Sequence, residues 1–156
     1  MPPEPPPVWT LDPRLAADTV ALGELPLSRV LVSKDANYPW LILVPRRPHL
    51  VEIIDLDDEG QIALMQEIAR VSRALNAVTT CDKLNVAALG NAVRQLHIHV
   101  IARFVTDPAG QNPVWGAVPA RAYGEAELAK FLASLRREIG LDGPPRPRSA
   151  PVDEST

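Results

Sequence analysis

Residues 95–101 of this 156-residue chain read Gln-Leu-His-Ile-His-Val-Ile. Polar and apolar side chains alternate along the run, which is typical of a β-strand that packs one face into a core. The alternation predicts that Gln95, His97 and His99 share one face of that strand. Neighbours on one face lie about 6.6 Å apart at the backbone. We therefore expect the two imidazoles to be close enough to contact a single phosphate group.

Two adjacent imidazoles support more than one chemistry. A neutral imidazole can attack phosphorus, while a protonated neighbour stabilises charge on oxygen or donates a proton. The same His-x-His spacing also suits a metal ion such as zinc, for which His49 is a further candidate ligand. Histidines are also common as polar surface residues without a special role. The pair alone leaves catalysis, metal binding and an incidental arrangement open.

The segments around this run predict an α+β domain. Short Val- and Leu-rich runs between turn residues predict five strands, at 19–25, 28–34, 40–44, 84–89 and 95–104. Helical spacing of apolar residues predicts one helix from a cap at Asp55 to about Val78, and another from Glu125 to Ile139 with Gly140 as its stop. Because strands and helices do not alternate as βαβ units, we expect a single antiparallel sheet of about five strands with two main helices.

Proline marks the limits of the predicted domain. The 17 prolines are concentrated at the two ends of the chain. They predict a Pro-rich N-terminal arm at residues 1–10, one folded domain at 11–141 and a disordered Pro-rich tail at 142–156.

Composition excludes several classes of partner. The formal net charge of −3 provides no general attraction to nucleic acid polymers. The longest apolar run, residues 40–44, is far shorter than the roughly 20 residues that a membrane helix needs. A single cysteine, Cys81, excludes an intramolecular disulfide, and the N-terminus does not resemble a secretory signal. These features predict a cytoplasmic protein.

The run at 95–101 resembles the histidine triad (HIT) superfamily motif His-φ-His-φ-His-φ-φ, where φ is apolar, with Gln95 in the first position. Residues 38–47, 84–91 and 113–116 resemble further HIT segments, in the same order along the chain. The resemblance covers roughly residues 15 to 118. Within the superfamily, the chain most resembles a bacterial subgroup in which Gln-φ-His-φ-His replaces the full triad.

This resemblance implies a HIT-like fold, a homodimer and a nucleotide as substrate. It implies a nucleotide phosphate hydrolase or nucleotidyl transferase that acts on dinucleoside polyphosphates or nucleoside phosphoramidates and needs no metal or other cofactor. His97 would attack the α-phosphorus to form a nucleotidyl-histidine, and His99 would contact the phosphate or the leaving group. Gln95 would complete the catalytic motif, but an amide does not titrate. The alternative is a nucleotide-binding protein with weak or no catalysis.

Four further residues are candidates for binding the nucleotide or its phosphates. By resemblance, Asn85 belongs to a strand that faces the motif, Asn91 to the loop before it, and His49 to a position where several family members carry another histidine. Trp115 stands in a loop rich in Pro and Gly, where large aromatic side chains often anchor contacts. Trp40, within an apolar strand, is expected in the core.

Overall fold

The computed structural model describes residues 1–141 and contains one antiparallel sheet of five strands in the order β1-β2-β3-β5-β4. The elements in chain order are α1 (Pro13–Asp18), β1 (Thr19–Glu24), β2 (Ser28–Ser33), β3 (Trp40–Pro45), η1 (Ile53–Asp55), α2 (Asp58–Thr79), β4 (Lys83–Ala87), β5 (Ile98–Arg103) and α3 (Glu125–Ile139). The predicted α+β class, antiparallel sheet and two main helices are confirmed. The tail predicted at 142–156 lies outside the described residues.

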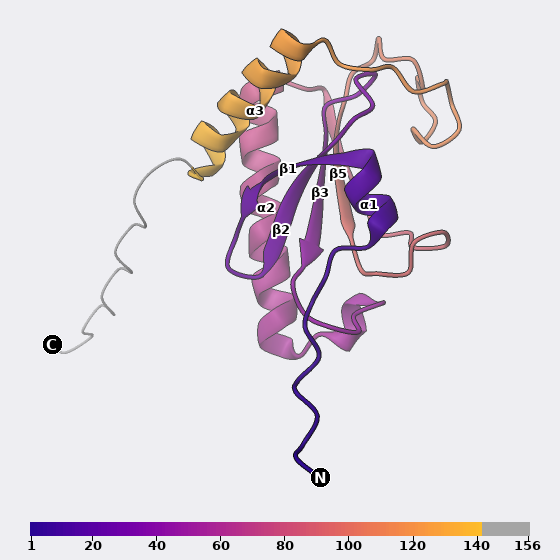
Figure 1. Ribbon diagram of the computed structural model, residues 1–156. Coiled ribbons are helices and arrows are strands. Elements are labelled where there is room, and N and C mark those ends of the chain that lie inside the picture. The colour runs from indigo at the N-terminus through magenta and orange to yellow at the C-terminus, as the bar shows by residue number, and fades with distance from the viewer. Residues whose placement is uncertain (142–156) are drawn as a thin grey trace, which may run out of the picture.

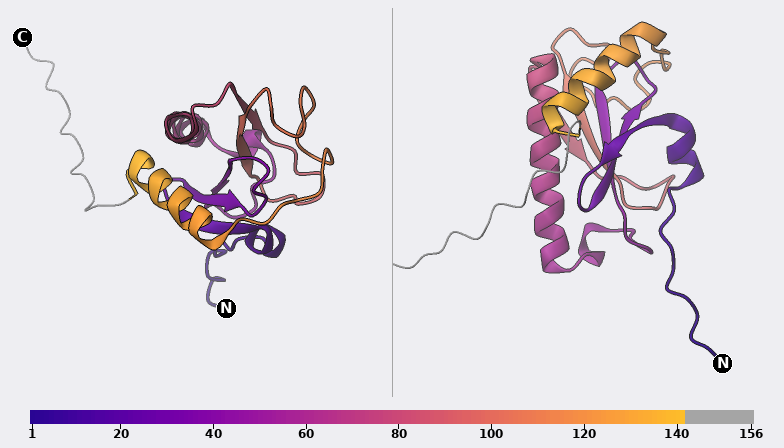
Figure 2. Two further views of the ribbon diagram at one scale, coloured as in Figure 1. Left: turned by 90° about the horizontal axis from the view of Figure 1, so that it is seen from above. Right: turned by 60° about the vertical axis from the view of Figure 1, so that its left-hand side comes forward.

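The two faces of the sheet are covered differently (Figures 1 and 2). The long helices α2 and α3 pack on one face, where Leu41 and Leu43 of β3 join Leu135 of α3 in the main hydrophobic core. On the opposite face, the short helix α1 packs its Leu15 against Ile42 of β3. Alternation along β3 therefore sends one set of side chains under the two long helices and leaves the other set beside α1.

Three local features differ from the sequence prediction. Strand β5 begins at Ile98 rather than at residue 95, and Gln95 lies at a bend, so strand alternation does not extend to it. Helix α2 is capped by Asp57, whose side chain accepts from Gly60 N, whereas Asp55 accepts from the backbone of the loop before η1. Helix α1 was not predicted, although Asp12 as N-cap followed by proline is a helix-start signal.

No helix within residues 1–141 is long and apolar enough to cross a membrane.

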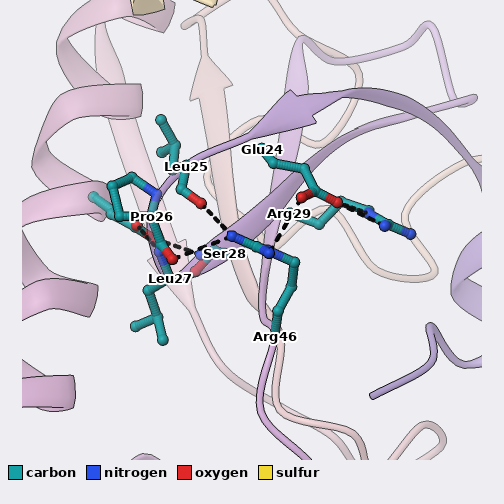
Figure 3. Close-up of polar contacts among 8 residues, drawn as sticks. Glu24, Leu25, Pro26, Leu27, Ser28, Arg29 and Arg46 are labelled. Carbon is teal, nitrogen blue, oxygen red and sulfur yellow. Dashed lines mark hydrogen bonds and ion pairs between the residues drawn. The ribbon is translucent and has the colours of Figure 1, made fainter. Parts of the chain in front are cut away.

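A half-buried guanidinium and a buried carboxylate stabilise the turn between β1 and β2. Arg46 donates to the carbonyls of Leu25 and Pro26 and pairs with Glu24 (Figure 3). From α2, the buried carboxylate of Glu67 accepts from the backbone N–H groups of residues 27 and 28 at 2.7 and 3.0 Å. The turn therefore obtains hydrogen-bond partners from the residue that follows β3 and from the helix that covers the sheet.

Replacement of Glu67 by alanine is expected to destabilise the fold by about 2–4 kcal/mol, because it leaves two buried N–H donors without acceptors. The measurement is urea unfolding of Glu67→Ala beside Gln66→Ala, which changes an exposed neighbour on the same helix. Equal midpoints for the two variants would contradict this role of the carboxylate.

Candidate active site

A cavity of about 830 Å³ opens on the face of the sheet opposite α2 and α3. This volume is within the range of about 300–1,000 Å³ for small-molecule sites. Its walls come from α1, β2, β3, the loop before β5 and the loop after it. They include Leu15, Asp18, Lys34, Trp40, Ile42, Asn91, Val93, His97, His99, Trp115 and Arg121. The structure thus brings the two motif histidines together in a largely apolar cavity of small-molecule size.

His97 lies at the entrance to β5 and is buried. Its Nδ1 is 2.7 Å from the backbone carbonyl oxygen of Gln95. A carbonyl only accepts hydrogen bonds, so Nδ1 carries the proton in this contact. In the neutral imidazole, Nε2 then bears the free lone pair, as a nucleophile requires.

His99 has the opposite tautomer. The indole Nε1–H of Trp40 donates to His99 Nδ1 at 3.0 Å. Indole is only a donor, so Nδ1 must accept, and the neutral ring carries its proton on Nε2. Burial, with a smaller contribution from the nearby His97, lowers the pKa of His99 to about 4. At neutral pH, His99 is therefore a neutral donor through Nε2–H.

The sheet register accounts for the contact between Trp40 and His99. Strands β3 and β5 pair so that Ile42 lies opposite His99, and Trp40 is two residues away on the same face of β3. The two imidazole centroids are 4.9 Å apart. Trp115 meets the rings of His99 and Trp40 edge to face, at 5.0 and 5.8 Å between centroids. His99 is thus held by the indole of Trp40 on the adjacent strand, whereas His97 is held by the backbone carbonyl of Gln95.

The loop that carries Trp115 is anchored by the buried Arg103 at the end of β5. Arg103 donates through Nε and Nη2 to both carboxylate oxygens of Asp107, at 2.7 and 3.0 Å, and through Nη2 to the carbonyl of Gly110. Its Nη1 donates to Oδ1 of Asn85 at 2.9 Å. The guanidinium also lowers the pKa of Asp107 from its ordinary value. This network connects β4, β5 and the loop next to the cavity.

The HIT domain family model matches residues 14–106. The chain belongs to the histidine triad (HIT) family. A histidine triad protein from Bradyrhizobium japonicum is 59% identical, with a TM-score of 0.84 over 85% of this chain and 99% of that one. A histidine triad protein from Marinobacter aquaeolei is 43% identical, with a TM-score of 0.83 over 86% and 98%.

A more distant HIT likeness concerns the fold alone. The diadenosine triphosphate hydrolase of Plasmodium falciparum, solved with cyclomarin A, is 15% identical, with a TM-score of 0.55 over 84% of this chain and 78% of that one. No curated protein matches the chain.

Not every predicted HIT site residue reaches the cavity. Asn91 and Trp115 line it beside the two histidines, and Trp115 keeps 39% of its surface exposed. Asn85 does not line it, since its side-chain oxygen accepts from Arg103. His49 is exposed, has a left-handed backbone (φ 63°) and lines a separate hollow of about 300 Å³.

Gln95 also lies outside the large cavity. Its side-chain Oε1 accepts from the backbone N–H of Asp12 at 2.9 Å, and its Nε2 donates to the backbone carbonyl of Thr10 at 2.8 Å. Arg14 adds a contact to the carbonyl of Ala92 in the loop before β5. Since Asp12 caps α1, Gln95 fastens the start of that helix, and with it one wall of the cavity, to the HIT motif.

Within residues 1–141, no three His, Cys, Asp or Glu side chains are grouped so that they could hold a metal ion. His97 and His99 form a pair, and His49 does not join them in the large cavity.

Two parts of this site were not predicted from the sequence, the hydrogen bond from Trp40 and the wall formed by α1. Trp40 was expected in the core, and its hydrogen bond to His99 was not detected, because nothing in a local apolar run indicates a polar partner 59 residues away. The Asp12-Pro13 pair was the available signal for helix α1.

Acid is expected to destabilise the fold through His99. Unfolding raises its pKa from about 4 to the ordinary value near 6.5, so the unfolded chain takes up a proton in this interval while the folded chain does not. The contribution of neutral His99 to the free energy of unfolding is fully present above pH 6.5 and is lost as the pH falls toward 4. Between pH 7 and pH 5, this loss is about 2 kcal/mol.

The measurement is urea unfolding at both pH values for the wild type and His99→Gln, which cannot titrate. The wild type should lose about 2 kcal/mol more than the variant. An equal decrease in the free energy of unfolding between pH 7 and pH 5 in both proteins would show that His99 is not responsible.

Proposed function

We propose that this protein is a nucleotide phosphate hydrolase or nucleotidyl transferase that works through a nucleotidyl-histidine intermediate on His97. The observation that carries the proposal is the pair of opposite tautomers in one cavity. Nε2 of His97 has a free lone pair, and Nε2 of His99 carries a hydrogen. One group can attack phosphorus while the other donates a hydrogen bond to a phosphate oxygen.

In the first step, His97 Nε2 attacks the α-phosphorus. The new P–N bond forms as the bond to the leaving group breaks, and the leaving group keeps that bond's electron pair. The positive charge that develops on the imidazole is stabilised by the Gln95 carbonyl at Nδ1. In the second step, water attacks phosphorus, the electron pair of the P–N bond returns to Nε2, and a proton passes to solvent. Another acceptor in place of water gives nucleotidyl transfer.

Membership in the HIT family supports this proposal, as does the fold shared with a diadenosine triphosphate hydrolase. The apolar walls suit a nucleobase, and the imidazole pair suits the phosphate. The homodimer that family resemblance implies is part of the same proposal. It is supported by the position of β4 at an edge of the sheet, where half the surface of Val86 is exposed.

His97→Ala is expected to abolish turnover, because it removes the attacking atom, while the fold is retained. The measurement is mass analysis, after a quench without acid, of protein incubated with α-labelled diadenosine polyphosphate. A nucleotidyl group should be found on the wild-type peptide that contains His97 and not on the variant. Arg94→Ala, which changes an exposed residue outside the large cavity, serves as the control and should retain the label.

Undiminished turnover by His97→Ala would refute the mechanism. Saturable nucleotide binding by the wild type, with neither label nor product over hours, would instead favour the nucleotide-binding alternative.

We assign Gln95 a positioning role in this reaction. Its backbone carbonyl orients His97, and its amide holds residues 10 and 12 next to the cavity. Gln95 does not line that cavity. The first motif position therefore stabilises the wall formed by α1 and does not carry a proton.

Restoration of the full triad by Gln95→His is accordingly expected not to accelerate the reaction. It removes the two contacts to Thr10 and Asp12, so the KM for nucleotide should rise about 5-fold while kcat stays within about 2-fold. Gln95→Met, similar in size but unable to make either hydrogen bond, should behave in the same way. A 10-fold or greater rise in kcat for the histidine variant alone would contradict the positioning role.

A further inference from the structure

Within residues 1–141, neither imidazole of the cavity is free to protonate a leaving group. In the proposed mechanism, His97 must be neutral at Nε2 to attack, and its Nδ1–H is directed at the Gln95 carbonyl. The Gln95 amide is hydrogen-bonded to the backbone of Thr10 and Asp12. Of the three motif positions, only His99 remains as a candidate acid.

The contact with Trp40 disfavours protonation of His99. To become an imidazolium, His99 would need a hydrogen on Nδ1, the atom that accepts the Trp40 indole N–H at 3.0 Å. Two N–H groups would then point at one another, in a buried position beside His97. Burial and the nearby His97 lower the pKa of His99 independently of this contact.

The other titratable side chains that line the cavity are engaged elsewhere or lie at its α1 end. Lys34 donates to the carbonyl of Ala17 at 2.8 Å, and Asp35 accepts from the backbone N–H groups of Asn37 and Arg121. The guanidinium of Arg121 donates to the carbonyl of Ala36 at 2.7 Å. Asp18 is exposed at the end of α1. Within residues 1–141, the only side chain hydrogen-bonded to either imidazole is that of Trp40.

We propose that this site cleaves phosphoanhydrides, whose leaving group departs as a phosphate anion, in preference to phosphoramidates, whose amine must be protonated to depart. This inference rests on the proposed function and narrows its substrate class to nucleoside polyphosphates and their derivatives. When the anhydride bond to the α-phosphorus breaks, the bridging oxygen keeps the electron pair as a phosphate oxygen. His99 Nε2–H donates a hydrogen bond to an oxygen of the α-phosphate and transfers no proton.

The test is the rate of His97 nucleotidylation by aryl esters of adenosine monophosphate whose phenol leaving groups differ in acidity. Without an acid catalyst, the single-turnover rate should fall at least about 100-fold from the 4-nitrophenyl to the phenyl ester. Under the same conditions, a diadenosine polyphosphate should exceed an alkyl phosphoramidate in kcat/KM by a similar factor of about 100. A change of less than about 10-fold across the ester series would overturn the inference, because it would reveal proton donation.

The variant Trp40→Phe tests whether the hydrogen bond from Trp40 is what prevents His99 from donating a proton. It removes the indole N–H and keeps an aromatic ring, so His99 becomes free to take up a proton. At pH 6, the ratio of the 4-nitrophenyl rate to the phenyl rate should be about 10-fold smaller in this variant than in the wild type. Trp115→Phe, which changes a ring that touches His99 without a hydrogen bond, should keep the steep dependence. An unchanged dependence in Trp40→Phe would overturn the role of Trp40, and if that variant does not fold, the wild-type series decides alone.

The two proposals fail in different ways. Absence of label on His97 with even the 4-nitrophenyl ester would refute the proposed function and the inference together. Label on His97 at nearly equal rates from every ester would leave the nucleotidyl-histidine mechanism intact and refute only the substrate preference.

Discussion

The site depends on a hydrogen bond between two strands, from the indole of Trp40 on β3 to Nδ1 of His99 on β5. This contact determines which nitrogen of His99 carries a hydrogen and disfavours its charged form. It is available because β3 and β5 are adjacent and antiparallel, with Ile42 opposite His99. The second imidazole is oriented independently, by a backbone carbonyl two residues earlier in the chain. One imidazole thereby has a free lone pair on Nε2, and the other carries a hydrogen there.

The unequal covering of the sheet makes room for this chemistry. Two long helices pack on one face and form the main core, so the opposite face needs only a short helix and loops. Those lighter elements leave a cavity of about 830 Å³ instead of a second close-packed layer. The buried pair of Arg103 and Asp107 stabilises the long loop that approaches this face. The main core thus lies on one face of the sheet and the cavity on the other.

How far the sequence predicts the site depends on the distance between interacting residues. His97 and His99 were correctly placed together because a two-residue spacing acts locally, and α3 was predicted from Glu125 to Ile139 because its apolar periodicity and terminal glycine are local signals. Gln95 was grouped with the histidines because strand alternation was extended into a bend. The polar role of Trp40 depends on the pairing of distant strands, which a single sequence does not reveal.

The position of Glu67 has a consequence for how the chain folds. The turn between β1 and β2 is a local structure, but two of its buried amides obtain their acceptor from a helix 39 and 40 residues later in the chain. In the isolated hairpin, these two amides would therefore donate to water. Burial of the turn becomes favourable only when α2 packs on the sheet and supplies the Glu67 carboxylate. Hairpin and helix form one cooperative folding unit, and the early part of the chain gains its full order only after residues up to the middle of α2 are in place.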